Sequence, residues 1–227
     1  SDFDNEIYAN EEHIDKFSLL CSSFFINNNT MKALPCFIGN KDGGKSLFKS
    51  LLSRMLERFG GDVSKRVVLM KKTESLLDND LIPLSNVRTA FTSELKKEDV
   101  YNEPLLKEIS GGDFKNKSVR RTSNDNVIIT IDAKIVIVSN HMPQSTDDAF
   151  QSRLLCCNFG NHFERNNETA NAISAKINDL FSYLCDYATQ FVRNDKCMFK
   201  PSPEMIKYTE KEILNQDTLR QWFGETY

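Results

Sequence analysis

Apolar residues along the chain form two patterns, which are short continuous runs and longer stretches with helical spacing. The runs predict buried strands over 33–38, 67–70, 87–92, 135–138 and 154–159, with a further extended stretch over 127–131. Helical spacing and turn residues predict helices over 14–26, 47–59, 104–109, 170–192 and 203–223. Because strands alternate with helices, we expect an α/β fold in which a mostly parallel, five-stranded sheet is covered on both faces.

The pattern changes near residue 164, after which only helices are predicted. The break at Lys200-Pro-Ser-Pro203 separates two of these helices. We therefore expect three parts: an N-terminal helical lead-in over 1–33, an α/β core over 34–163 and a C-terminal helical region over 164–227.

Composition narrows the class of protein. The 227 residues are 40% hydrophobic and 27% charged, which are globular proportions, and 29 Lys+Arg against 32 Asp+Glu give a formal net charge of −3. This balance argues against a protein that wraps DNA as histones do, but it is compatible with nucleic-acid binding through a locally basic element. The six cysteines form no C-x-x-C pair, so a zinc ribbon is not predicted. We expect no membrane span and no signal peptide, hence an intracellular protein, and the two chain ends suggest a piece of a longer polypeptide.

One segment carries a specific chemical prediction. It lies between a predicted strand and a predicted helix and fits the pattern G-x-x-x-x-G-K-[ST], in which the backbone N–H groups surround phosphates, the lysine neutralises the β- and γ-phosphates and the hydroxyl binds Mg²⁺. The predicted nucleotide-binding residues are Gly39, Asn40, Lys41, Asp42, Gly43, Gly44, Lys45, Ser46 and Leu47. We therefore expect ATP and Mg²⁺ as cofactors.

Glu94 is the candidate catalytic carboxylate. It follows the strand predicted over 87–92, and ligands of open α/β sheets bind beyond the carboxyl ends of the strands. A carboxylate there can hold Mg²⁺ through water or orient the attacking water. A single glutamate is also common on protein surfaces, so the position alone leaves both readings open.

Four segments in order resemble the motif set of superfamily-three helicases, which are AAA+-like enzymes of viruses and mobile elements. They are the phosphate loop Gly39 to Ser46, Thr92-Ser-Glu94, Leu106-Lys-Glu-Ile-Ser-Gly-Gly-Asp113 and Ala133-Lys-Ile-Val-Ile-Val-Ser-Asn140-His-Met-Pro143. The similarity is greatest to the poxvirus-type and phage or plasmid primase-helicase branch, and it covers about residues 34–223. It implies an AAA+/ASCE-type P-loop core and a hexameric, ATP-driven DNA translocase.

The resemblance also assigns roles to single residues. Asn140 matches the polar residue that positions the lytic water, and Arg153 matches the arginine finger that reaches the nucleotide of a neighbouring subunit. The stretch after Asp113 matches a DNA-gripping hairpin, whose candidate contacts are Phe114, Lys115, Lys117, Arg120 and Arg121. The family often carries two adjacent acids where this chain has Ser93-Glu94, and its arginine after Gly-Gly-Asp comes sooner than Arg120. It therefore stays open which acid holds Mg²⁺ and which orients the water, and which side chains contact DNA.

The resemblance thus implies a helicase domain that moves along single-stranded or fork DNA as a homohexamer, with a primase region of the same polypeptide as a further partner. Two alternatives remain, a P-loop kinase of a small molecule and an ATP-binding ring protein that does not unwind DNA. A nucleus and a cytoplasmic viral factory are both compatible with the sequence.

Overall fold

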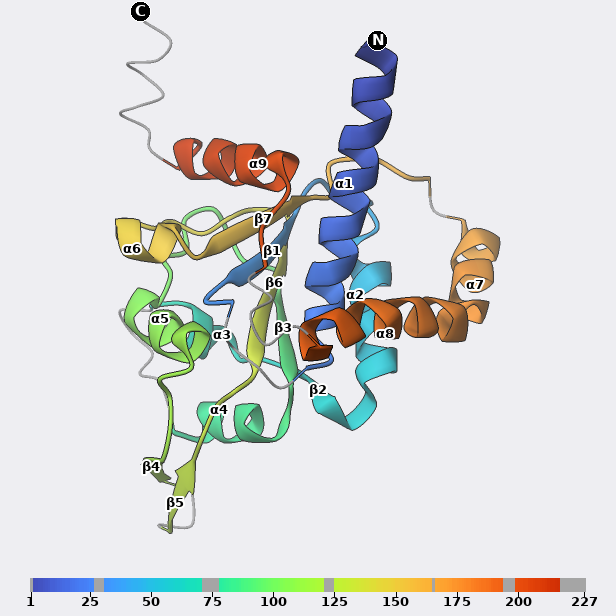
Figure 1. The fold of residues 1–227 in the computed structure, drawn as a ribbon. Coiled ribbons are helices and arrows are strands. Elements are labelled where there is room, and N and C mark those ends of the chain that lie inside the picture. Colours follow the sequence, from blue (N-terminus) through green and yellow to red (C-terminus); the bar gives the residue numbers. More distant parts are fainter. Residues whose placement is uncertain are drawn as a thin grey trace, which may run out of the picture.

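The structure is a computed structural model that describes residues 2–26, 31–70, 78–120, 125–164, 166–193 and 199–216 (Figure 1). None of the helices within these ranges has the length and apolar character that crossing a bilayer requires.

A five-stranded sheet forms the centre of the molecule, and all of its strands are parallel. Its strand order is β2-β3-β6-β1-β7, where the strands are β1 (Leu34–Ile38), β2 (Gly60–Asp62), β3 (Thr89–Ser93), β6 (Lys134–Ser139) and β7 (Leu154–Asn158). Ile38 is in register with Ser139 on one side and Asn158 on the other. The carboxyl ends of these strands therefore meet at one edge of the sheet, and the predicted fold class is confirmed.

One of the five predicted strands is wrong. Residues 67–70 do not join the sheet, because Lys65–Val68 form the short helix α3, which Ser64 caps by accepting a hydrogen bond from the Arg66 N–H. Val67 and Val68 are fully buried, and an apolar run of this length does not distinguish a buried helical turn from a strand. The missing strand is β2, at Gly60–Asp62, where the sequence predicted only the end of a helix.

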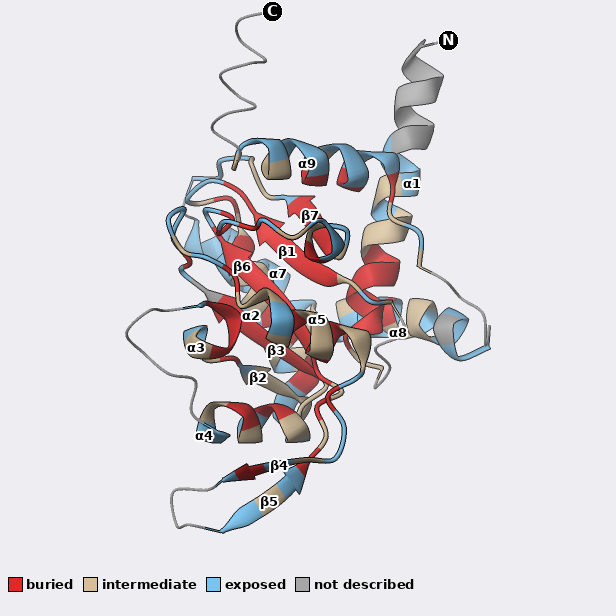
Figure 2. Ribbon diagram, turned by 90° about the vertical axis from the view of Figure 1, so that its left-hand side faces the viewer, coloured by how far each residue is buried: buried red, intermediate tan, exposed pale blue. Residues whose placement is uncertain are grey.

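Alternate residues of the central strands face two separate hydrophobic clusters. Ile135 and Ile137 of β6 belong to one cluster, whereas Val136 and Val138 belong to the other. The first cluster includes Leu106 and Ile109 of α5 (Glu103–Gly111), and the second includes residues of α1 (Asp2–Ser23), α2 (Lys45–Leu56) and α8 (Ile177–Arg193). Helices thus cover both faces of a buried sheet, which makes a three-layer α/β fold of the P-loop NTPase type (Figure 2).

The remaining elements lie at the margins of these layers. They are η1 (Glu57–Phe59), α4 (Asp78–Leu81), η2 (Ile82–Asn86), β4 (Lys117–Arg120), β5 (Asn126–Ile129), α6 (Asp148–Gln151), α7 (Asn167–Ala175) and α9 (Pro203–Leu214). The helix predicted over 170–192 is in fact two helices, α7 and α8. Helix α9 ends at Leu214, and residues 215–216 form a turn, so the helix predicted to 223 is too long there; residues 217–223 of that prediction lie outside the described residues. The division into three parts stays a prediction.

Helix α9 covers the outer strand β7. The Thr209 hydroxyl accepts a hydrogen bond from the Cys156 N–H at 2.8 Å and donates one to the Met205 carbonyl at 2.7 Å. An outer strand exposes a row of N–H and C=O groups that can pair with another chain. Thr209 satisfies one of these groups, so the contact helps to protect the edge of the sheet.

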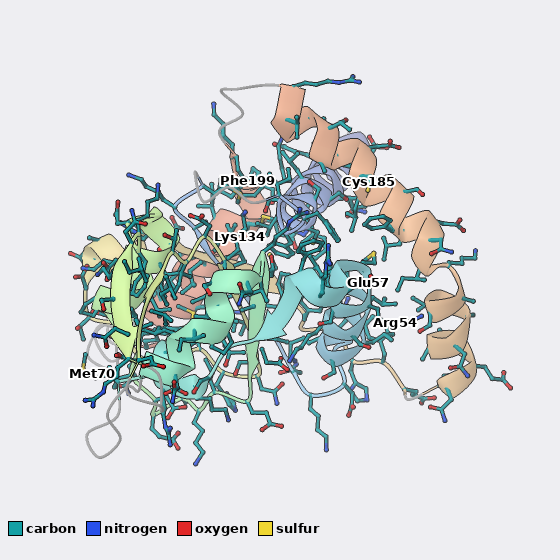
Figure 3. All side chains as sticks on the ribbon, turned by 90° about the horizontal axis from the view of Figure 1, so that it is seen from below. Arg54, Glu57, Met70, Lys134, Cys185 and Phe199 are labelled. Carbon is teal, nitrogen blue, oxygen red and sulfur yellow. The ribbon has the colours of Figure 1, made fainter. Side chains whose placement is uncertain are left out.

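The amino-terminal ends of β3 and β6 hold the turn that follows α1. Thr89 donates to the Phe24 carbonyl at 2.9 Å, Arg88 to the Phe25 carbonyl at 2.7 Å and Lys134 to the Ile26 carbonyl at 2.8 Å. Lys134, labelled in Figure 3, is buried, and burial lowers the pKa of its ammonium group to about 8. Two cations and a hydroxyl therefore satisfy three successive carbonyl groups and join the N-terminal helix to the core.

Thr89 and Thr92 provide a matched test of this contact, since both are buried on β3 and only Thr89 has a described hydroxyl partner. Thr89→Val leaves the Phe24 carbonyl without its partner, so we expect the free energy of unfolding to fall by about 1–3 kcal/mol in urea titrations. Thr92→Val removes a hydroxyl with no partner among the described residues and is expected to be neutral or stabilising. Equal losses in the two variants would contradict this role for Thr89.

Candidate nucleotide site

The phosphate loop connects the carboxyl end of β1 to the start of α2. Gly44 is the residue that precedes the helix and has a φ of 82°, and Asp42 has a φ of 62°. Left-handed backbone in a turn before a helix directs successive N–H groups to one side, where they can surround an anion. The twelve-residue α2 adds the positive end of its dipole at the same place. The predicted loop therefore has the local geometry that phosphate binding requires.

Lys45 lies inside this loop with only 7% of its surface exposed. Its ammonium group donates to the Gly39 carbonyl at 2.7 Å and to the Asn40 carbonyl at 2.6 Å. Burial lowers the pKa of Lys45, and the nearby Asp42 opposes this shift. The side chain is thus held at the centre of the loop by backbone carbonyls, which phosphate oxygens can replace as partners. Ser46 is exposed beside it at the start of α2.

The chain that follows β7, residues 158–163, lies against the loop and is named here the covering segment. An ideal Cβ on Gly39 or on Gly43 would lie 2.1 Å from the Phe159 carbonyl oxygen, so neither position has room for a side chain. The Asn40 amide donates to the Gly160 carbonyl at 3.3 Å, and the Phe163 N–H donates to the Asp42 carbonyl at 3.1 Å. Sequence reasoning missed this contact, because nothing in residues 160–163 indicates what they touch.

Glu94 directly follows β3 at the same edge of the sheet. Its φ is 60°, a conformation that is uncommon for residues other than glycine, and its side chain is 87% exposed. Lys65 donates to the Glu94 backbone carbonyl at 2.9 Å, and its ammonium lies 3.9 Å from the Glu94 carboxylate. Ser139 donates to the Leu95 carbonyl at 3.0 Å, which ties the turn after Glu94 to β6.

Asn140 is the exposed residue that follows β6, the strand between β1 and β3. The phosphate loop, Asn140 and Glu94 therefore leave three neighbouring strands at one edge, in that order. No group of three metal-ligating His, Cys, Asp or Glu side chains occurs within the described ranges. Magnesium ions are often held by one or two protein oxygens together with the substrate phosphates, and the Ser46 hydroxyl and the Glu94 carboxylate fit that requirement.

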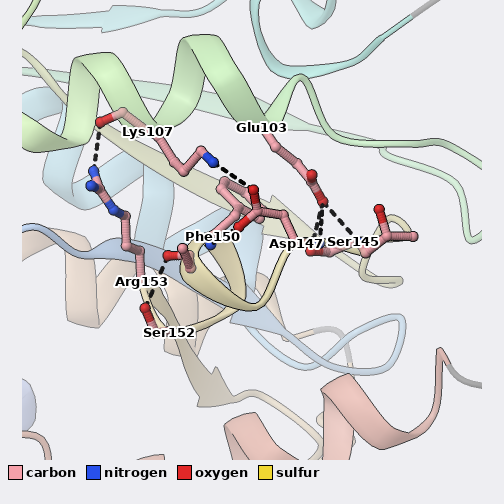
Figure 4. A network of polar contacts seen from close by, with 9 residues as sticks. Glu103, Lys107, Ser145, Asp147, Phe150, Ser152 and Arg153 are labelled. Carbon is pink, nitrogen blue, oxygen red and sulfur yellow. Dashed lines mark hydrogen bonds and ion pairs between the residues drawn. The ribbon is translucent and has the colours of Figure 1, made fainter.

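Arg153 lies at the opposite edge, because it precedes β7, whereas the phosphate loop is next to the carboxyl end of that strand. The five residues of β7 separate it from Phe159, and the six steps of extended chain correspond to about 20 Å. Its guanidinium donates to the Lys107 carbonyl at 2.5 Å (Figure 4). It also donates to the Ser110 hydroxyl at 3.1 Å, near the end of α5. The predicted arginine finger is therefore out of reach of the phosphate loop of its own chain.

An ion pair and a cap hold the turn before Arg153. The Asp147 carboxylate accepts from the Phe150 N–H at 2.8 Å and from the Lys107 ammonium at 2.5 Å (Figure 4). The hydrogen bond from Lys107 is the main cause of the lowered pKa of Asp147. Glu103 adds a second carboxylate, which accepts from the Ser145 hydroxyl at 2.8 Å. Lys107 thus joins α5 to the loop before α6.

The predicted DNA-gripping stretch forms an antiparallel hairpin of β4 and β5, which projects from the amino-terminal side of the sheet (Figure 1). Phe114 is only 3% exposed and packs in the hydrophobic cluster at its base. Lys117 pairs with Glu108 and lies over the Phe114 ring. Lys115 and Arg120 are exposed, and Arg121 is outside the described residues. Of the predicted contacts, Lys115 and Arg120 are thus the two basic side chains placed on the surface.

Three solved structures that share this fold are all forms of the C-terminal region of NrS-1. The A form of the apo C-terminal region is 15% identical to this chain in sequence, with a TM-score of 0.60. The matched part is 88% of this chain and 47% of that chain. A second A-form structure is 16% identical with a TM-score of 0.57, and the match covers 90% of this chain and 46% of that chain. A further apo structure is 13% identical with a TM-score of 0.60, and the match covers 88% of this chain and 47% of that chain. This chain therefore spans about half the length of the structures it resembles.

At these identities the similarity shows a common fold. No family model matches the chain. No curated protein matches its sequence either.

Gly43 and Gly61 allow a test of the contact between the loop and the covering segment. A Cβ on Gly43 would strike the Phe159 backbone, whereas a Cβ on Gly61 would meet the Val87 side chain at 3.1 Å. We expect Gly43→Ala to lower the free energy of unfolding by about 3 kcal/mol and Gly61→Ala to lower it by no more than about 1 kcal/mol in urea titrations. If Gly43→Ala is as stable as the wild type, the covering segment does not pack on the loop in solution.

Proposed function

We propose that this chain is the ATPase domain of a DNA helicase, which hydrolyses ATP between the subunits of a ring and moves along single-stranded DNA. The observation that carries the proposal is the arrangement at the carboxyl edge of the sheet. There the phosphate loop, Asn140 and Glu94 leave three adjacent parallel strands. This is the arrangement expected from the resemblance to superfamily-three helicases.

Each residue at this edge has a role in the proposed reaction. Lys45 binds the β- and γ-phosphates of ATP, and the Ser46 hydroxyl helps to hold Mg²⁺, which supplies neutralisation of phosphate charge. Glu94 orients the attacking water through its carboxylate, and Asn140 donates to the water or to the γ-phosphate. The exposed Glu94 side chain and its uncommon backbone conformation support this role, since strain of this kind gathers at functional sites.

The position of Arg153 supports a ring in this proposal. The guanidinium stabilises the transition state only if it reaches a γ-phosphate, and about 20 Å of strand separates it from the loop of its own chain. We therefore propose that it acts on the nucleotide of a neighbouring subunit in a homohexamer. In the free subunit its partners are the Lys107 carbonyl and the Ser110 hydroxyl, so insertion into the neighbouring site replaces these contacts.

The hairpin is the proposed DNA contact. Its exposed Lys115 and Arg120 suit phosphate contacts that do not read sequence, which is what a translocating motor requires. The substrate in this proposal is single-stranded or fork DNA in the replication of a virus or mobile element. A primase region of the same longer polypeptide is a further proposed partner.

The action of Arg153 between subunits can be tested by mixing two inactive variants. We expect Lys45→Ala and Arg153→Ala each to lose about 10³-fold in steady-state ATP hydrolysis measured with single-stranded DNA. Mixing them is expected to restore part of the activity, because the intact Arg153 of one variant then faces the intact loop of the other. Wild-type turnover per subunit is expected to rise with protein concentration and with DNA.

Ser152→Ala, next to Arg153, is the control and is expected to keep wild-type activity, since the exposed Ser152 hydroxyl donates within its own turn, to the Ala149 carbonyl. A mixture no more active than its components would argue against action between subunits. Turnover that is independent of protein concentration, DNA and Arg153 would instead favour a small-molecule kinase. Lost assembly in Lys45→Ala with full function in Glu94→Gln would favour a ring protein that does not unwind DNA.

The hairpin contact predicts how DNA binding depends on salt. Lys115→Ala and Arg120→Ala are each expected to weaken binding to single-stranded DNA equally for different sequences. Each is also expected to reduce the slope of log K against log salt by about 0.7 in fluorescence anisotropy titrations. Lys211→Ala on α9 removes a positive charge that is also exposed and is expected to change neither quantity. A slope that is the same in all variants would place the DNA elsewhere.

A further inference from the structure

Arg153 and two carboxylates, Glu103 and Asp147, belong to one polar cluster beside α5 (Figure 4). Lys107 is at its centre, because its ammonium group donates to the Asp147 carboxylate while its backbone carbonyl accepts from the Arg153 guanidinium. A single residue makes both contacts. The Asp147 carboxylate and the Arg153 guanidinium are therefore separated by no more than the length of one lysine residue and two hydrogen bonds.

Arg153 nevertheless has only uncharged partners. Its guanidinium donates to the Lys107 carbonyl and the Ser110 hydroxyl, and no ion pair joins it to a carboxylate among the residues that the structure describes. Asp147 binds Lys107 instead, and the hydrogen bond from Lys107 is the main cause of the lowered pKa of this carboxyl group. A bidentate contact with a carboxylate would hold the guanidinium more strongly than a carbonyl and a hydroxyl do. Arg153 is therefore held by contacts that can exchange for a phosphate.

The second carboxylate of the cluster is occupied as well. One oxygen of Glu103 accepts from the Ser145 hydroxyl at 2.8 Å and from the Thr146 N–H at 2.9 Å. The same oxygen accepts from the Asp147 N–H at 3.4 Å. The loop before α6 thus supplies the partners of Glu103, while α5 supplies the partner of Asp147. Each of the two acids therefore has partners other than Arg153.

The backbone of Arg153 is held from two directions. The Leu34 N–H donates to the Arg153 carbonyl at 2.7 Å, and the Arg153 N–H donates to the Phe150 carbonyl at 2.9 Å. Phe150 is fully buried and packs on Tyr101, with the ring centroids 5.1 Å apart. Transfer of the guanidinium to a neighbouring subunit therefore depends on rotation of the side chain, and on the groups of its own subunit that compete for it.

We propose that Lys107 is a positioning residue for Arg153. By keeping Asp147 paired, Lys107 prevents this carboxylate from capturing the guanidinium, so that Arg153 stays available to the nucleotide of the neighbouring subunit. Without the Lys107 ammonium, the long side chain of Arg153 reaches Asp147 by rotation about its own bonds and forms an ion pair within the subunit. The inference rests on the proposed function, since it requires that Arg153 act between subunits.

A double-mutant cycle on Lys107 and Asp147 tests the proposal. Steady-state ATP hydrolysis with single-stranded DNA is measured for the wild type, Lys107→Met, Asp147→Asn and the double variant. Methionine keeps an unbranched side chain without the charge, and asparagine keeps an oxygen that can accept from the Phe150 N–H. Lys107→Arg is the conservative variant. Lys49→Met is the matched control, because it breaks a 2.7 Å ion pair with Asp62 on α2 and β2.

We expect Lys107→Met to lower kcat about fivefold with no change in KM for ATP, because Asp147 then holds Arg153 for most of the time. The double variant is expected to recover to within about twofold of the wild type, since asparagine at 147 has no charge to capture the guanidinium. Asp147→Asn, Lys107→Arg and Lys49→Met are expected to remain near the wild type. Adding Lys45→Ala to Lys107→Met is expected to raise turnover, because intact loops then face an available Arg153. Thermal unfolding checks that all variants fold.

Two results would overturn this role of Lys107 and leave the proposed function standing. Turnover of Lys107→Met equal to that of the wild type would mean that Asp147 does not compete for Arg153. A loss of turnover in Lys107→Met that the double variant shares would mean that Lys107 acts in another way. Wild-type turnover that does not fall in Arg153→Ala would instead remove the action between subunits, and the role of Lys107 with it.

Discussion

The contact between the Phe159 carbonyl and the glycines at 39 and 43 is the constraint on which the rest of the structure depends. Because a backbone oxygen fills the space that two Cβ atoms would need, the phosphate loop has one shape and one distance from β7. The buried ammonium of Lys45 then finds its partners within that loop. The parallel register of β1 with β6 and β7 fixes the neighbouring strand ends relative to it. Packing of glycine on backbone, rather than any charged contact, thus sets the geometry of the site.

The carboxyl ends and the amino-terminal ends of the strands form two opposite edges of the sheet, and these carry different kinds of residue. Polar residues with exposed side chains leave the strands at the carboxyl edge, where the proposed chemistry takes place. The amino-terminal edge carries structural contacts, including the Arg88, Thr89 and Lys134 contacts to the turn after α1, the Arg153 contacts to α5 and the base of the hairpin. In the proposed ring, each interface joins the carboxyl edge of one subunit to the opposite edge of the next.

The sequence predicted the elements whose pattern depends on local chemistry. The phosphate loop, the strands ending near Ile38, Ser93 and Ser139, and the helix at 104–109 follow from glycine spacing and apolar runs. The strand at Gly60–Asp62 could not be found this way, because two of its three residues have no side chain. Nor could the burial of Phe114, or the partners of Arg153, which lie 46 and 43 positions away along the chain. Local pattern identifies an element, whereas only tertiary packing decides which face of it is available.

The cover that Thr209 gives to β7 has a consequence for assembly. With one edge strand protected by a helix and the other, β2, only three residues long, the sheet offers little backbone for pairing with another chain. Subunits of the proposed ring that meet at this sheet then do so through side chains rather than through a continuous sheet. Contacts of that kind involve no ladder of backbone hydrogen bonds. The five-stranded sheet is therefore poorly suited to fibre-like stacking by strand addition.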